Sequence, residues 1–98
     1  MNGDLRFWNI LRSSSEPETK KFALRIIKLF RSLPRTTEAQ VLGKQLLRSG
    51  TAVAAKCRAR SKAEFIGRLG IVVEEADESS FWLELLSDSE IVRPGKIG

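Results

Sequence analysis

The segment FALRIIKLFRSLP, residues 22–34, decides the fold, because it carries a helical repeat that ends in a proline. Its apolar residues recur at spacings of three and four, which places them on one face of an α-helix. They are Phe22, Ile26, Leu29, Phe30 and Leu33. Ser15 is a suitable N-cap, and Pro34 ends the helix because it disfavours the α conformation in the residue before it. We therefore expect a first helix from about residue 16 to residue 33.

Two capping-box motifs predict the starts of two further helices. Thr37-Glu38-Ala39-Gln40 and Ser61-Lys62-Ala63-Glu64 both have the Ser/Thr-x-x-Glu/Gln spacing, with Thr37 and Ser61 as the expected N-caps. The second helix would bury Val41, Leu42, Leu46, Leu47 and Val53. The third would run to about Ser87 and bury a stripe of Phe65, Leu69, Val72, Val73, Ala76, Ser80, Leu83 and Leu86, widened by Ile66, Ile71 and Trp82.

Three amphipathic helices with short connections predict an all-α fold, an antiparallel up-down helical bundle. Sustained alternation of apolar and polar residues is missing, so we expect no sheet. The domain should span residues 16–92, with an N-terminal segment at 1–15 that could add a short helix and a C-terminal tail at 93–98. With 98 residues the chain is long enough for one domain.

The middle of the second helix is rich in small residues, including Gly43, Ser49 and Gly50. The main interpretation is a close approach between helices, and the alternative is room for a ligand beside the backbone. A glycine inside a helix costs about 1 kcal/mol relative to alanine. We therefore expect a packing reason for Gly50.

The sequence lacks residues on which several classes of function usually depend. The sequence has no histidine and a single cysteine, which removes the commonest general base and the ligand set of a zinc site. The acidic cluster Glu74, Glu75, Asp77 and Glu78 could be a metal site, but a solvated face or a partner for basic side chains is the better interpretation. Cys57 lies among cations that could lower its pKa, yet we expect a small buried or half-buried residue. We predict no enzyme, no catalytic residue, no cofactor and no metal.

The location of the protein follows from what the chain lacks. No stretch reaches the roughly 20 apolar residues of a membrane span, and we expect no signal peptide in the first fifteen residues. A lone cysteine fits a reducing compartment. We expect a cytoplasmic protein without a membrane partner.

Charge is divided unevenly along the chain. Residues 1–60 hold 13 Lys and Arg against 4 Asp and Glu, whereas residues 61–98 hold 4 against 8. The candidate nucleic-acid-binding residues are Lys21, Arg25 and Lys28 on one side of the first helix, and Lys56, Arg58, Arg60 and Lys62 at the junction of the second and third. They could bind phosphates without reading bases, or they could form a solvated face. Aromatic residues for stacking on single strands are not interleaved with them.

Several motifs resemble one known family. They are Phe22–Leu29, Leu33-Pro34, Gly43–Ala55, Arg58–Phe65, Leu69–Val72, Glu74–Ser79 and Trp82–Leu86. In this order they resemble the four-helix-bundle proteins encoded in intervening sequences of 23S ribosomal RNA genes, over roughly residues 21–92. The resemblance implies a bacterial, cytoplasmic bundle without recognised catalytic residues. A related family member is the accessory protein of diversity-generating retroelements, which implies a basic homopentamer that binds nucleic acid and a reverse transcriptase.

Two departures separate the chain from this family. After Ala55 the chain is shorter by about four residues, close to one helical turn, which preserves the apolar phase. The family's fourth helix is also missing, so Phe65, Ile71 and Trp82 lose part of their expected cover. The segment Leu5–Leu11 could fill that place, other subunits could fill it, or an apolar patch could stay exposed; we favour oligomerisation.

These observations lead to two hypotheses for function. The first is a non-catalytic, homo-oligomeric helical adaptor that binds RNA or DNA through its basic surface, beside a reverse-transcriptase-like protein partner. The second is a protein–protein assembly module without nucleic-acid binding, in which basic helices face the acidic third helix of a neighbour.

Overall fold

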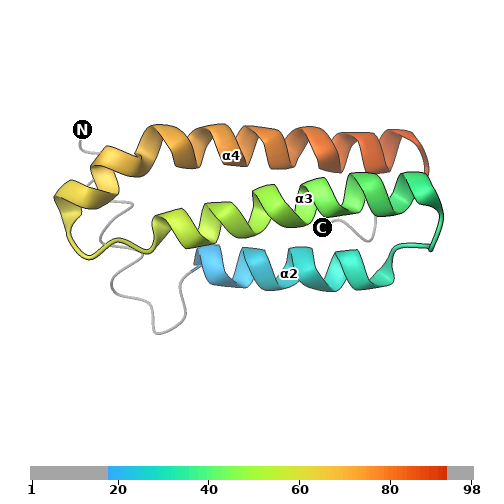
Figure 1. Ribbon diagram of the computed structural model, residues 1–98, viewed down its shortest axis with the longest axis horizontal. Coiled ribbons are helices and arrows are strands. Elements are labelled where there is room, and N and C mark those ends of the chain that lie inside the picture. Colours follow the sequence, from blue (N-terminus) through green and yellow to red (C-terminus); the bar gives the residue numbers. More distant parts are fainter. Residues whose placement is uncertain (1–17, 93–98) are drawn as a thin grey trace.

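The protein is an all-α helical bundle, as predicted. The computed structural model describes residues 18–92, which form α2 (Glu18–Ser32), α3 (Thr37–Cys57) and α4 (Lys62–Asp88), and no strand occurs among them. The three helices run antiparallel, with α3 between α2 and α4 (Figure 1). This arrangement places α2 and α4 at opposite edges of the molecule.

The helix starts are set by hydroxyl caps. Ser61 is the N-cap of α4, and its Oγ accepts a hydrogen bond from Glu64 N at 3.1 Å, as predicted. The expectation for α3 was wrong by one residue, because Thr36, not Thr37, is the N-cap and its Oγ1 accepts from Ala39 N at 3.4 Å. Gln40 does not close a capping box; its Nε2 donates to Pro34 O at 3.1 Å and ties α3 to the preceding connection.

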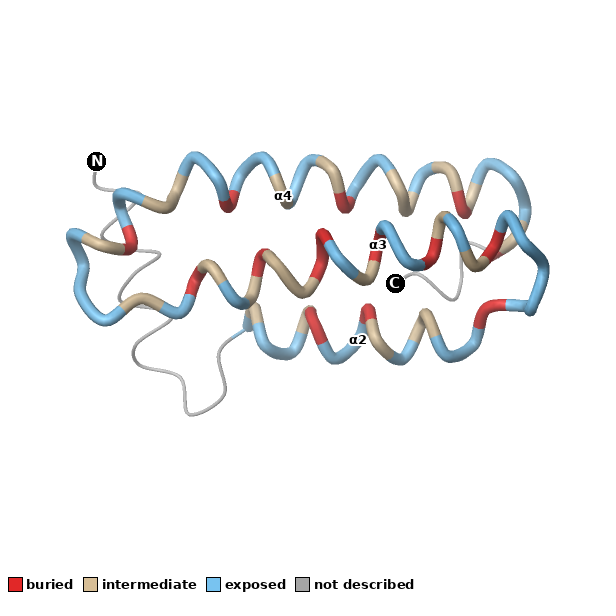
Figure 2. The backbone as a smooth tube through the Cα atoms, in the orientation of Figure 1, coloured by how far each residue is buried: buried red, intermediate tan, exposed pale blue. Residues whose placement is uncertain are grey.

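The core forms two clusters on the inner sides of the helices (Figure 2). The buried members of the first cluster are Ile26, Leu33, Ala39, Leu46, Leu86 and Val92. Those of the second are Val53, Cys57, Phe65 and Val72. The predicted stripe of the first helix is confirmed, since Phe22, Leu29 and Phe30 pack against the first cluster beside Ile26 and Leu33.

Six residues expected in the core are exposed instead. Val41 is 55% and Val73 is 53% exposed, and Ile66, Ile71, Ala76 and Ser80 are exposed as well. Ser79, which was not in the predicted stripe, is buried. For α4, the reason is that its buried positions repeat every seven residues and turn slowly around the helix, so a stripe drawn from apolar residues alone drifts away from the contact with α3.

The glycines of α3 allow a close approach to α2, as predicted. A Cβ on Gly50 would lie 3.0 Å from Ile26 Cγ1, and one on Gly43 would lie 2.5 Å from Leu33 Cδ1. Both glycines are buried. The alternative interpretation, room for a ligand beside these glycines, is not supported, because side chains of α2 already occupy the space next to them.

The chain turns sharply after α4. Glu90 has a φ of 63°, the left-handed conformation that usually takes glycine at a helix end. Glu90 N donates to Ser87 O at 3.0 Å, and Val92 N donates to Leu86 O at 3.1 Å. This turn directs Val92 back into the first core cluster, where it is buried.

Several sequence-based expectations lie outside the described residues. They concern the helix start at residues 15–17, the N-terminal segment 1–15 with Leu5–Leu11, and the tail 93–98. Within residues 18–92, no helix combines the length and apolarity needed to cross a membrane.

Candidate nucleic-acid interface

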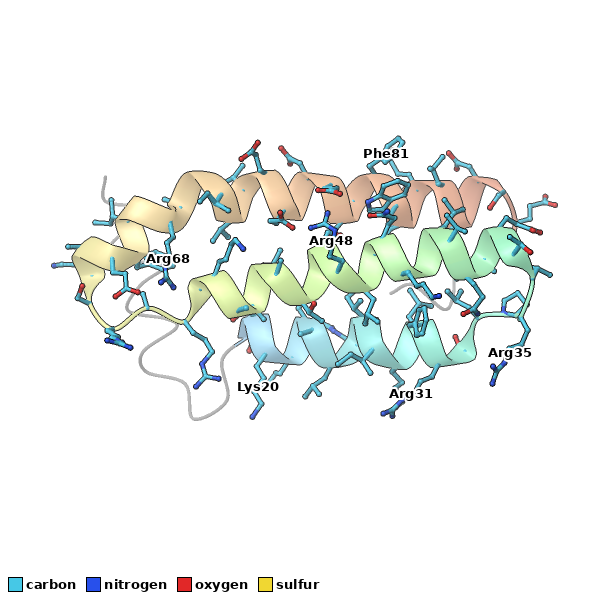
Figure 3. All side chains as sticks on the ribbon, in the orientation of Figure 1. Lys20, Arg31, Arg35, Arg48, Arg68 and Phe81 are labelled. Atoms are coloured by element: carbon cyan, nitrogen blue, oxygen red, sulfur yellow. The ribbon has the colours of Figure 1, made fainter. Side chains whose placement is uncertain are left out.

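The outward side of α2 carries a dense group of cations, which we call the α2 cationic face. Its members are Lys20, Lys21, Arg25, Lys28 and Arg31, all exposed. The opposite side of α2 buries Ala23 and Ile26 against the core, which fixes the cations toward solvent. Lys20 and Arg31 extend from α2 on the side away from α3 (Figure 3). The apolar pattern that forms the helix therefore also presents its charge.

The α2 cationic face is little neutralised by the protein itself. Lys21 Nζ lies 3.4 Å from Glu18 Oε1, one turn away, and both side chains are exposed. Exposed pairs of this kind contribute less than about 1 kcal/mol and are screened by salt. Among residues 18–92, the other four cations have no ion-pair partner. The face is thus free to meet an anionic partner.

The spacing of these cations suits a chain of phosphates. From Lys20 to Arg31 the helix rises about 16 Å at 1.5 Å per residue. Lys21, Arg25 and Lys28 follow at intervals of four and three residues, which places a cation about every 4.5–6 Å along the axis. Leu24, 48% exposed, is the large apolar side chain among them.

The remaining candidate cations lie at the connection between α3 and α4, and we call them the junction cations. Lys56 is half-buried in the last turn of α3, Arg58 and Arg60 lie in the connection, and Lys62 begins α4. The backbone here is fixed, because Arg68 Nη1 donates to Arg58 O at 3.2 Å and Arg60 N donates to Glu64 Oε2 at 3.4 Å. The side chains of Arg58, Arg60 and Lys62 are exposed.

The structure only partly brings the two groups together. The beginning of α2 and the end of α3 lie at the same end of the molecule (Figure 1), so Lys21 is close to the junction end. Lys28 lies two turns further along α2, away from that end. The α2 cationic face and the junction cations are therefore two surfaces that meet at one end.

Arg48 is a structural cation that the sequence analysis did not single out. It extends from α3 toward α4 (Figure 3), where it pairs with Glu78 and, at 3.4 Å, with Glu75. Trp82 Nε1 donates to Glu78 Oε1 at 3.3 Å. The hydrogen bonds from Arg48 and Trp82 lower the pKa of Glu78, and the hydrogen bond to Glu78 raises the pKa of Arg48. No local pattern announces this pair, because 27 to 30 residues separate the partners.

The acidic cluster of α4 is divided by these contacts. Glu75 and Glu78 form ion pairs with Arg48, which agrees with the interpretation of this cluster as a partner for basic side chains. Glu74 and Asp77 are exposed. No group of three or more His, Cys, Asp and Glu side chains within residues 18–92 is placed to hold a metal ion.

The buried hydroxyls between α3 and α4 form a structural contact. Ser79 Oγ lies 3.0 Å from Ser49 Oγ and 2.9 Å from Glu75 O, and Ser49 Oγ donates to Gln45 O at 3.0 Å. Both serines are at most 2% exposed, so no substrate can reach them. Small hydroxyl side chains here let α3 and α4 approach closely while every polar atom keeps a partner.

Cys57 is buried, as predicted. Burial raises the pKa of its thiol, the opposite of the lowering that neighbouring cations could have produced. A raised pKa reduces the thiolate fraction, which is the reactive form.

Comparison with known protein families, curated proteins and solved structures gave no match. The surface itself must therefore carry the argument for function.

Proposed function

We propose that this protein is a non-catalytic helical adaptor that binds nucleic acid through phosphate contacts on the α2 cationic face. The observation that carries the proposal is the exposure of five cations on one helix side, four of them without an ion-pair partner among residues 18–92. Lys and Arg that neutralise phosphates release condensed counterions, and this release drives sequence-independent binding. The junction cations form a second surface that meets this face at one end of the molecule.

The distribution of acids supports this assignment. Glu75 and Glu78 are engaged by Arg48, and Glu64 is engaged by Arg68. Glu74 and Asp77 are exposed on α4, at the edge opposite α2 (Figure 1), and the exposed acid of α2 itself is Glu18, beside Lys21. A polyanion that approaches α2 therefore meets five cations and one acid on that helix.

Assembly with other subunits belongs to the same proposal. The outward side of α4, which we call the α4 outer edge, exposes Phe81 to 50% and Ile66 to 44%. Gly67 and Gly70 face open space on this edge, since an added Cβ would meet nothing within 4 Å. Phe81 extends from the edge away from α3 (Figure 3). Apolar groups exposed along one side of a helix suit contact with a protein surface.

The family resemblance gives this assembly a specific form. We propose a homo-oligomer, a pentamer by that resemblance, with a reverse-transcriptase-like protein as a further partner and the cytoplasm as its location. The motifs from Phe22 to Leu86 support this part of the proposal, together with the three-helix arrangement.

The alternative is an assembly module that binds no nucleic acid. The exposed acids and apolar side chains of the α4 outer edge favour it, because they could dock against the α2 cationic face of a neighbouring copy. Such a contact joins opposite edges of the molecule and repeats head to tail. Light scattering across a salt series separates the two: high salt dissociates a charge-paired oligomer, whereas in the adaptor it releases only the nucleic acid.

Two matched triple variants test the location of the interface. Lys21→Gln/Arg25→Gln/Lys28→Gln and Arg58→Gln/Arg60→Gln/Lys62→Gln each remove three positive charges, so they change net charge equally. We expect the first to weaken binding to labelled duplex DNA strongly and to make the logarithmic salt slope shallower by about 3. The second should have the smaller effect. Circular dichroism checks that both remain helical, and equal losses in the two variants would contradict binding through α2.

A further inference from the structure

The shape of α2 distinguishes among nucleic acids. Because α2 packs against α3 at an edge of the molecule, it presents a convex ridge to solvent (Figure 1). At 3.6 residues per turn, Lys20 and Arg31 lie on one flank of this ridge and Lys21 and Arg25 on the other, about 110° away around the axis. Lys28 lies between the flanks. The cations thus form two rows on either side of a helical ridge.

Single strands lack the contacts they need on this surface. Proteins that bind single strands stack bases on aromatic side chains. The aromatic residues of α2, Phe22 and Phe30, pack against the core. Phe65 is buried, and the exposed Phe81 lies on α4 with its ring against Trp82, at a centroid distance of 5.0 Å. Within the described part of the chain, residues 18–92, no aromatic ring accompanies the α2 cationic face.

A ridge with two cationic flanks matches a groove with two phosphate rows. A helix with its side chains is about 10–12 Å in diameter, and the major groove of B-form DNA is about 12 Å wide and admits one. The major groove of A-form RNA is deep and too narrow for such a ridge. In a B-form groove, one flank of α2 would meet the phosphates of each strand.

The charge of the rest of the molecule favours the same orientation. The exposed Glu74 and Asp77 lie on α4, with α3 between them and α2. The molecule measures 24 Å along its intermediate axis, and the Debye length at physiological salt is about 8 Å. A duplex held against α2 is therefore screened from these two acids, and the exposed acids nearer to it are Glu18 and Glu38, at the starts of α2 and α3.

We infer that α2 docks in the major groove of B-form duplex DNA, with Lys20 and Arg31 contacting one phosphate backbone and Lys21 and Arg25 the other. The inference rests on the proposed function and names its ligand. In this orientation Leu24 and Lys28 face the floor of the groove, where the base edges lie. One leucine and one lysine make too few contacts with base edges to recognise an extended sequence. We therefore expect binding that is selective for the form of the duplex and tolerant of its sequence.

A competition among nucleic-acid forms tests this inference. Fluorescence anisotropy would compare a 20-base-pair DNA duplex, an RNA duplex of the same sequence and the single DNA strand at one salt concentration. We expect the DNA duplex to bind at least about tenfold tighter than either competitor. Equal or tighter binding of the RNA duplex or the single strand overturns the groove inference and leaves the proposed function standing. Absence of binding to all three overturns both.

The two flanks provide a second measurement. Lys20→Gln/Arg31→Gln removes both charges of one proposed row, and Lys21→Gln/Arg25→Gln removes both charges of the other. We expect similar losses of duplex affinity from the two variants, and protection of guanine N7 in the major groove from dimethyl sulfate by the wild-type protein. Loss confined to one flank, or unprotected N7 atoms under saturating protein, contradicts docking in the groove.

Discussion

Replacing Gly43 by alanine tests the close approach of α2 and α3 on which the position of the cationic face depends. The added Cβ would lie 2.5 Å from Leu33 Cδ1 and 3.0 Å from Phe30 Cδ1. Leu33 is buried, so its methyl group cannot move into solvent. Either the side chains of α2 leave their preferred rotamers or the two helices separate.

The magnitude follows from two opposing effects. Alanine in place of glycine in a helix interior gains about 1 kcal/mol of stability. Overpacking a well-packed core costs about 1–3 kcal/mol. The net change expected for Gly43→Ala is therefore between no change and a loss of about 2 kcal/mol. Gly70→Ala is the matched control, because its Cβ would meet nothing within 4 Å and should stabilise the protein by about 1 kcal/mol.

The difference between the two variants isolates the packing effect, since the helix propensity is the same in both. Urea unfolding followed by circular dichroism should place Gly43→Ala about 1–3 kcal/mol below Gly70→Ala. For a domain of this size, 1 kcal/mol corresponds to roughly 4–8 °C in melting temperature. If Gly43→Ala stabilised the protein as much as Gly70→Ala, α2 would not be held closely against α3 and our account of the fold would be refuted.

Three further changes have defined outcomes. Ser79→Ala removes a buried hydrogen bond but leaves Ser49 bonded to its own helix, so urea unfolding should show a loss of about 1 kcal/mol, and a gain would count against the hydroxyl contact. Glu90→Gly relieves a left-handed non-glycine residue, so the free energy of unfolding should rise by up to about 1 kcal/mol, whereas a fall would contradict the observed turn. Because the hydrogen bond from Arg48 lowers the pKa of Glu78, the pair stabilises the fold at neutral pH, and this contribution is lost as pH falls from the ordinary value of 4.5 through the lower folded-state pKa. Arg48→Gln should therefore reduce the difference in stability between neutral and acidic pH, and an unchanged difference would show that the pair is not formed in solution.

Local sequence patterns predicted the helices well because the signals for helix ends are local. Pro34 and the hydroxyl of Ser61 act within one turn of their own positions. The error at Thr37 has the same origin, since Thr36 and Thr37 are both competent caps and the spacing to Gln40 favoured the wrong one. The side chain of Gln40 donates to Pro34 O instead of closing a capping box with Thr37, and this hydrogen bond depends on the path of the connection.

Contacts between helices could not be predicted in this way. Arg48 with Glu75 and Glu78, and Ser49 with Ser79, depend on the register of α3 against α4. The sequence of a single chain indicates which face of each helix is apolar, but it does not indicate the axial position at which two helices pack together. The same limit explains why Val73 was assigned to the core although it is half exposed.

The candidate site was predicted in composition more than in arrangement. The exposure of Lys21, Arg25 and Lys28 follows from the apolar pattern of α2, which directs them away from Ile26. Lys20 and Arg31 complete the same face once the buried side of the helix is known. The relation of α2 to the junction cations required the packing of α3 between α2 and α4.

The measurement that tests the central claim most directly is the salt dependence of binding to duplex DNA. If the five cations of the α2 cationic face each neutralise one phosphate, the affinity should fall with a logarithmic slope of about −4.5. This corresponds to a loss of about 500-fold between 50 and 200 mM salt. A slope shallower than about −1, or no binding at 50 mM salt, would contradict a phosphate-binding role for this protein.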